Sequence, residues 1–223
     1  MTKELFFQAT GKFLLGLLLT ALFLFLPAGT LRYPNGWLFI GILFVPMLLV
    51  GIALMMRNPA LLKKRLDANE REEEQKALVL LSGMLFVAAF VVAGLNFRFS
   101  WMLLPRWAVY GASAVFLAAY WMYAEVLREN AYLSRTVEVQ EGQKVIDSGL
   151  YGIVRHPMYS ATLILFLSTG LVLGSPISFF ILLLYIPLIA KRIRREEVLL
   201  SRELEGYEEY RSRVKYRLIP RIW

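Results

Sequence analysis

Long apolar runs alternate with short polar segments along this chain, and four of the runs are long enough to cross a bilayer. These runs occupy residues 13–28, 37–56, 77–96 and 103–127. A transmembrane helix needs about 20 predominantly apolar residues, which is close to the length of each run. The pattern therefore predicts a membrane protein built from helices.

Two shorter apolar runs follow at residues 159–174 and 177–190, with the turn Gly174-Ser175-Pro176 between them. So short a connection predicts a tight antiparallel helical hairpin, whose arms either cross the bilayer or dip in and return. The expected fold class is an all-α, polytopic integral membrane bundle of about five to six transmembrane helices, the last two forming this hairpin. Pro46 and Pro187 lie inside apolar runs, and we expect them to kink their helices.

The polar segments suggest three further elements. Residues 57–76 carry mixed charges and predict a solvated amphipathic helix that serves as a connector. Residues 136–140 alternate in polarity, which favours an extended strip over the membrane mouth. The charged tail, residues 191–223, is expected to form one surface helix that continues from the last span and ends near Pro220.

The distribution of charge orients the bundle. Of the 25 Lys and Arg residues, 22 lie in the N-terminal segment, in the polar segments after the second and fourth long runs, and in the tail, while 3 lie in the opposite turns. Because positive residues favour the inner face, both termini are expected in the cytoplasm of a multi-pass protein of the cell or inner membrane.

Composition narrows the chemistry further. The chain is 58% hydrophobic, and its net charge of +8 is concentrated beside the apolar runs. We therefore expect the lipid bilayer, and no nucleic acid, as the partner of the basic residues. With no cysteine and a single histidine, a metal site is not expected.

The only histidine lies in a distinctive segment, Gly149 to Tyr159, where a polar loop enters the first arm of the hairpin. Pro157 suits the first position of a helix, because its missing N–H is no loss there. The backbone N–H groups before it are then expected to face a ligand. An interfacial anchor is the alternative, because Tyr and Arg also favour headgroup depth.

A hairpin would bring this segment close to the start of the tail. The side chains of Arg192, Arg195, Glu196 and Glu197 would then lie beside residues 155–159. The loop at residues 143–146 would form a third wall of the same pocket. An ordinary surface ion pair between Arg192 and Glu196, spaced i,i+4, remains the simpler alternative.

These motifs resemble the isoprenylcysteine carboxyl methyltransferase (ICMT) family, whose Arg-His-Pro and Glu-Glu elements phospholipid N-methyltransferases share. The resemblance covers residues 131–223 and rests on three elements: Gly149-x-Tyr151-x-x-x-Arg155-His156-Pro157-x-Tyr159, Glu196-Glu197-x-x-Leu200 and Tyr207-x-x-Tyr210. It implies a cytoplasmic pocket for S-adenosyl-L-methionine (SAM), with S-adenosyl-L-homocysteine as product, and a lipophilic methyl acceptor that enters from the membrane. It also divides the single membrane domain into N-terminal helices at 1–127 and a cofactor-binding and catalytic region at 128–223.

The family pattern also implies site residues. The cofactor contacts would be Gln143, Lys144, Val145, Ile146, Tyr151, Arg155, His156, Pro157, Met158, Tyr159 and Glu196. The catalytic candidates are Arg192, His156 and Glu197. One departure is the strip at 143–146, Gln-Lys-Val-Ile, where family enzymes that act on prenylcysteine often have His-x-Leu-Val; backbone contacts would survive this change.

The residue types suggest roles for these side chains. Arg155 and the helix start would receive the cofactor's carboxylate, and Glu196 its ammonium or ribose hydroxyls. Arg192 would orient an acceptor carboxylate, which needs no base. An amine or hydroxyl acceptor would need one, from His156 or Glu197.

Three other functions compete with carboxyl methylation. The same family pattern allows N-methylation of a phospholipid or other amine. A sterol-reductase-like enzyme that uses NADPH would share the C-terminal helical core, but the sequence shows no clear basic cluster for the extra phosphate. A transporter or scaffold would require polar residues in mid-span, and the spans here are nearly devoid of them.

Overall fold

The computed structural model describes residues 3–66, 73–133 and 139–223, and every regular element in these ranges is a helix. The elements are α1 (Lys3–Ala28), α2 (Pro34–Arg57), α3 (Pro59–Leu66), α4 (Glu73–Phe99), α5 (Arg106–Glu129), the 3-10 helix η1 (Gly149–Gly152), α6 (Pro157–Val172), α7 (Pro176–Leu183), α8 (Tyr185–Glu203) and α9 (Tyr207–Arg213). This confirms the predicted all-α membrane bundle. The alternating strip predicted at 136–140 lies largely outside the described residues.

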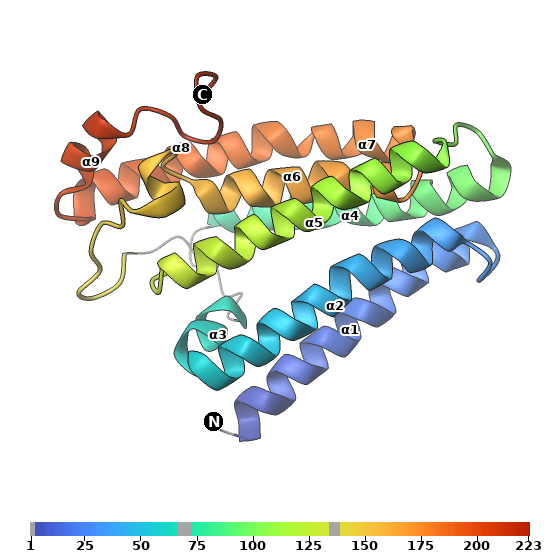
Figure 1. Cartoon of the computed structure of the whole chain (residues 1–223), viewed down its shortest axis with the longest axis horizontal. Coiled ribbons are helices and arrows are strands. Elements are labelled where there is room, and N and C mark those ends of the chain that lie inside the picture. Colours follow the sequence, from blue (N-terminus) through green and yellow to red (C-terminus); the bar gives the residue numbers. More distant parts are fainter. Residues whose placement is uncertain (1–2, 67–72, 134–138) are drawn as a thin grey trace.

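Among the described residues, four stretches are long and apolar enough to cross a membrane: Lys3–Ala28, Pro34–Arg57, Lys76–Phe99 and Pro176–Glu203. Helix α5, which covers most of the run predicted to span at 103–127, is not one of them. The last joins α7 and α8, and α6 is a shorter apolar helix of 16 residues. The long helices lie roughly side by side, with three turns at one end and α3, η1 and α9 at the other (Figure 1). The elements that carry the predicted site residues therefore gather at one end of the bundle.

The core joins the two halves of the sequence. Leu24 and Phe39 from the first two helices cluster with Phe116 of α5 and Leu173 at the end of α6, all nearly inaccessible to solvent. Helix α1 packs against α4, and α5 packs along α6. The helices of the first half thus cover part of the apolar surface of the C-terminal elements, while Phe180 and Leu184 stay exposed.

The predicted tight hairpin is confirmed in α6 and α7, which Leu173, Gly174 and Ser175 connect. Its arms touch at Gly170, where an added Cβ would lie 2.4 Å from the backbone nitrogen of Phe179. Only glycine fits at so short a separation. Two bonds fasten the turn from outside: the Tyr33 hydroxyl donates to the Leu173 carbonyl at 2.6 Å, and the Leu104 N–H donates to the Gly174 carbonyl at 3.1 Å.

The two helices that were predicted to kink at a proline differ in whether the proline interrupts them. Helix α2 continues through Pro46, whereas the second arm of the hairpin is interrupted at Leu184, between α7 and α8. The break follows from Pro187, which has no N–H for the carbonyl of Leu183 and whose ring crowds that carbonyl.

The expectation of one long surface helix in the tail is wrong. Helix α8 ends at Glu203, Gly206 adopts a left-handed φ of 79°, and α9 begins at Tyr207. Beyond α9 the chain returns to the start of α6, where the N–H groups of Arg155 and His156 donate to the Tyr216 and Arg217 carbonyls at 2.9 Å each. Burial of an apolar cluster drives the reversal; its members are Leu204, Tyr207, Tyr210 and Val214.

Candidate functional site

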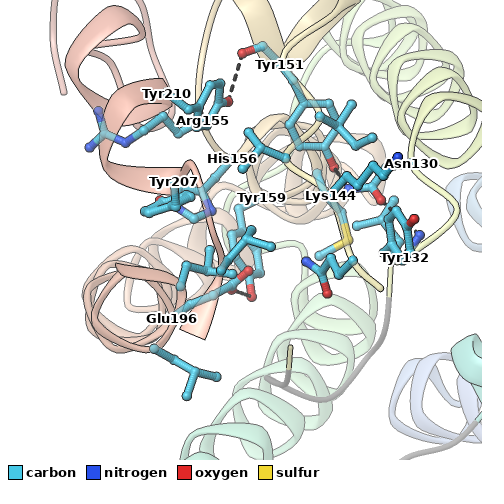
Figure 2. A pocket seen from close by; sticks show the side chains of 18 residues that line it. Asn130, Tyr132, Lys144, Tyr151, Arg155, His156, Tyr159, Glu196, Tyr207 and Tyr210 are labelled. Atoms are coloured by element: carbon cyan, nitrogen blue, oxygen red, sulfur yellow. Dashed lines mark hydrogen bonds between the residues drawn. The ribbon is translucent and has the colours of Figure 1, made fainter. Parts of the chain in front are cut away.

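A pocket lined by polar and aromatic side chains lies at the end of the bundle where η1, α8 and α9 meet the start of α6 (Figure 2). It contains most of the predicted cofactor contacts: Gln143, Lys144, Val145, Ile146, Tyr151, Arg155, His156, Met158, Tyr159 and Glu196. Pro157 is not among the lining residues; it begins α6, as the sequence predicted. The structure therefore brings together residues from three separated stretches of the chain.

The hairpin places His156 and Glu196 on the walls of this one pocket. Tyr159, which is 37 positions from Glu196, donates its hydroxyl to Glu196 Oε2 at 2.5 Å. Arg192 Nε in turn donates to the same hydroxyl at 3.1 Å. A polar chain thus runs from Arg192 through Tyr159 to the carboxylate inside the pocket.

Glu197 faces away from the pocket and holds a buried charge cluster. Its Oε1 accepts from Arg155 Nε at 2.8 Å and lies 3.3 Å from His156 Nε2, and its Oε2 accepts from Arg217 Nε at 2.8 Å. Glu197 does not line the pocket, and three basic side chains surround its carboxylate. The geometry assigns it a positioning role in place of the predicted role as a base.

The predicted anion site at the helix start is also corrected. The N–H groups of Arg155 and His156 are occupied by the tail carbonyls, so they do not face a ligand. The Arg155 side chain is 5% exposed and bonds Glu197 and the carbonyl of Val214, the latter at 2.7 Å. Its guanidinium is a structural link between α8 and the tail.

The pocket has lining residues that were not predicted as cofactor contacts: Asn130, Tyr132, Leu133, Leu199, Leu200, Leu204, Tyr207 and Tyr210. Asn130 Nδ2 donates to the Tyr151 hydroxyl at 2.9 Å, and the Tyr210 hydroxyl donates to the Tyr151 carbonyl at 2.8 Å. The sequence showed the spacing of Tyr207 and Tyr210. It did not show that the chain turns at Gly206 and so brings these two side chains to the pocket.

Tyr207 lines the pocket, but its hydroxyl is buried behind the pocket wall. Its hydroxyl is buried and finds no hydrogen-bond partner among the described residues. Burial raises the pKa of Tyr207 and of Tyr151, so both side chains stay neutral phenols. The unsatisfied hydroxyl is inaccessible to solvent in this structure, so it does not face the pocket.

A second cavity, of about 310 Å³, adjoins the first. It is mostly apolar and is lined from four helices by Arg65, Leu78, Val79, Ser82, Gly83, Phe86, Met158, Tyr159, Thr162, Phe166, Tyr185, Leu188, Ile189 and Arg192. Met158 and Tyr159 line both cavities. Val79 and Gly83 line the cavity and are exposed, so the cavity opens at the surface of α4, one of the candidate membrane spans.

Two arginines belong to this second cavity. Arg192, predicted on the acceptor side, lines it and does not line the first pocket. Arg65 of α3 reaches the junction, with Nη1 at 3.6 Å from the Met158 sulfur and a hydrogen bond to the Tyr123 hydroxyl. The sequence indicated only a connector here, because mixed charge gave no hint that Arg65 reaches Tyr123 of α5 and Met158 of α6.

Residues 111–202 match the model of the isoprenylcysteine carboxyl methyltransferase (ICMT) family. This stretch is an ICMT-family region. It begins in α5 and ends in α8, and so includes the hairpin and both glutamates but not α9 or the returning tail. The predicted resemblance, placed at 131–223, is confirmed over residues 131–202, whereas its third element, Tyr207-x-x-Tyr210, lies beyond the match.

The fold as a whole is also ICMT-like. A solved structure of the eukaryotic intramembrane Ras methyltransferase ICMT superposes with a TM-score of 0.57, over 92% of this chain and 73% of that one. The sequence identity is 19%, so this likeness concerns the fold alone.

Curated relatives of the ICMT-family region include two sterol reductases. The chain is 27% identical over 135 residues to the Delta(14)-sterol reductase of Methylotuvimicrobium alcaliphilum, and 33% identical over 91 residues to that of Mus musculus. The matches cover 54% and 40% of this chain but 32% and 22% of those proteins. The chain thus spans about a third or less of these relatives, and the region occurs in proteins named for different reactions.

Proposed function

We propose that this protein is a SAM-dependent methyltransferase that esterifies the carboxylate of a lipophilic acid arriving from the bilayer. The observation that carries the proposal is the junction at Met158 and Tyr159, where a polar, aromatic pocket meets an apolar cavity that opens at the surface of α4, a candidate membrane span. Two sites of such different polarity suit a water-soluble cofactor and a membrane-borne acceptor.

The lining of the first pocket fits SAM. Tyr151, Tyr159 and His156 offer aromatic faces for adenine, and Glu196 offers a carboxylate for the ammonium or the ribose hydroxyls. When bound, SAM supplies a methyl group on a sulfonium, with S-adenosyl-L-homocysteine as the leaving product.

The second cavity favours an acid over an amine as acceptor. Arg192 and Arg65 would repel an alkylammonium and attract a carboxylate, which Arg192 can orient through two parallel hydrogen bonds. A carboxylate needs no general base, which agrees with the structural role of Glu197. The apolar walls exclude water, and this favours a reaction in which a carboxylate and a sulfonium neutralise each other.

A reductase is the second candidate, favoured by the curated relatives. It would bind NADPH, whose extra phosphate needs cations. Of the Lys and Arg side chains that line the first pocket, Arg155 already bonds Glu197 and Val214, which leaves Lys144 for a phosphate. The lining therefore suits SAM better.

Cofactor binding by the purified full chain tests this assignment. Calorimetry is expected to detect SAM but not NADPH, and both Glu196→Gln and His156→Ala are expected to weaken SAM binding at least tenfold. Glu203→Gln, an exposed position in the last turn of the same helix, is the matched control and should bind SAM normally. Tight NADPH binding, or undiminished SAM affinity in both site variants, would refute the proposal.

Gly83 offers a test of the acceptor cavity alone. It lines the cavity, and a Cβ added there meets no atom within 4 Å, so Gly83→Leu should fold and fill the cavity. Leucine is also favoured over glycine within a helix by about 0.5–1 kcal/mol. We expect at least a tenfold lower kcat/KM for the acceptor with unchanged SAM affinity.

The control for this variant is Gly111→Leu, on an exposed part of α5 where an added Cβ also meets no atom within 4 Å. Its kinetics should equal those of the wild type. Wild-type acceptor kinetics in Gly83→Leu would place the acceptor elsewhere.

A further inference from the structure

An arginine-lined hollow of about 380 Å³ lies beside the charge cluster of Glu197, outside both cavities described above. Three segments build it: α8, α9 and the returning tail. Its lining consists of Arg194, Glu197, Val198, Ser201, Arg202, Arg211 and Arg217. Helix α9 also walls the cofactor pocket, because Tyr207 and Tyr210 lie on it.

The charges in the hollow do not balance. Four arginine side chains and one carboxylate, that of Glu197, line the hollow. This carboxylate already accepts a hydrogen bond from Arg155 and lies 3.3 Å from His156 Nε2. Arg211 bonds the exposed Glu208 at 3.1 Å, whereas Arg194 and Arg202 have no ion-pair partner among the described residues. Gathering like charges costs free energy, and a bound anion would relieve that cost.

The hollow lies at the end of a candidate membrane span, where we expect lipid headgroups. Helix α8 belongs to the apolar stretch Pro176–Glu203, and Arg194 and Arg202 fall in its last ten residues, where the span leaves the bilayer. Val198, which is 52% exposed, adds an apolar contact beside the arginines. Arginines with an apolar neighbour at the end of a span match the phosphate and upper acyl chain of an anionic lipid.

We propose that this hollow binds the phosphate of an anionic phospholipid headgroup and that the lipid fastens α9 and the tail onto α8. The bound phosphate bridges Arg194 and Arg202 of α8 to Arg211 of α9 and Arg217 of the tail. It thereby holds Tyr207 and Tyr210 in the wall of the cofactor pocket. The effect on SAM affinity rests on the proposed function, whereas the lipid site itself does not.

The test compares the full chain in nanodiscs of phosphatidylcholine alone and in nanodiscs that contain 30% phosphatidylglycerol. We expect the anionic discs to raise the melting temperature by about 5 °C. The double variant Arg194→Gln/Arg202→Gln should lose this shift, and Arg194→Lys/Arg202→Lys should retain most of it. Arg32→Gln/Arg106→Gln, with the same charge change at the other end of the bundle, is the control and should behave as the wild type.

Further measurements distinguish a lipid headgroup from free phosphate and test whether lipid binding affects SAM affinity. Inorganic phosphate added to phosphatidylcholine discs should leave the melting temperature unchanged; an equal shift would overturn the lipid assignment in favour of a free-anion site. The absence of any shift in anionic discs would overturn the site itself. SAM affinity should rise about threefold in anionic discs, and unchanged affinity despite thermal stabilisation would overturn the coupling to the cofactor pocket.

Discussion

Replacing Arg192 with glutamine is expected to lower kcat for methyl transfer at least 100-fold, while the Kd for SAM changes less than threefold. The side chain lines the acceptor cavity and not the cofactor pocket, and its Nε bonds the Tyr159 hydroxyl at the junction of the two. Loss of a group that orients the reacting carboxylate typically costs two to three orders of magnitude in rate.

Arg192→Lys separates orientation from charge. Lysine keeps the positive charge but lacks the planar fork, so kcat should remain at least tenfold below that of the wild type. Lys215→Gln, an exposed position that lines none of these cavities, serves as the control. Single-turnover and steady-state rates would measure both effects, and full activity in Arg192→Gln would remove this arginine from the mechanism.

Glu197→Gln is expected to produce the largest loss of stability. The carboxylate is 6% exposed and bonds Arg155, whose side chain is 5% exposed, as well as Arg217 of the tail. Removing one partner of a buried ion pair leaves the other charge uncompensated and costs about 3–5 kcal/mol. For a chain of this size we expect the melting temperature in detergent to fall by about 10 °C.

Glu203→Gln is the matched control for this experiment, because the same substitution at an exposed position should shift the melting temperature by no more than a degree or two. Limited proteolysis gives a second measurement. In Glu197→Gln the segment after α9 should be cleaved faster, since Arg217 loses its bond to α8. Equal melting and cleavage in the two variants would show that the charge cluster contributes little.

The sequence predicted the helices and the hairpin well because these depend on local patterns. The length of the apolar runs, the brevity of the connection at Gly174-Ser175-Pro176 and the fixed φ of Pro157 are all properties of neighbouring residues. They were enough to place His156 and Glu196 on one pocket. That the predicted contact residues bind SAM remains a prediction, to which the structure adds that most of them line one pocket.

What the sequence could not predict depends on distant contacts. The reversal after Gly206 is driven by burial of Tyr207 and Tyr210. Because tyrosine is also common at membrane interfaces, the sequence alone did not indicate that these two residues are buried. The Arg155 and His156 N–H groups were assigned to a ligand because no local pattern shows that tail carbonyls reach them. Arg65 was missed for the same reason, since a run of charges does not reveal which side chain turns inward.

The bonds from Tyr33 and Leu104 to the turn of the hairpin have a consequence for protein engineering. The groups that make these bonds come from two loops of the N-terminal half, so that half helps to fix the shape of the hairpin of α6 and α7. A chimera that takes its first helices from a distant relative should assemble only if a tyrosine equivalent to Tyr33 accompanies them. Conversely, residues 128–223 expressed alone should fail to mature, and supplying the N-terminal helices as a separate polypeptide is the natural way to rescue them.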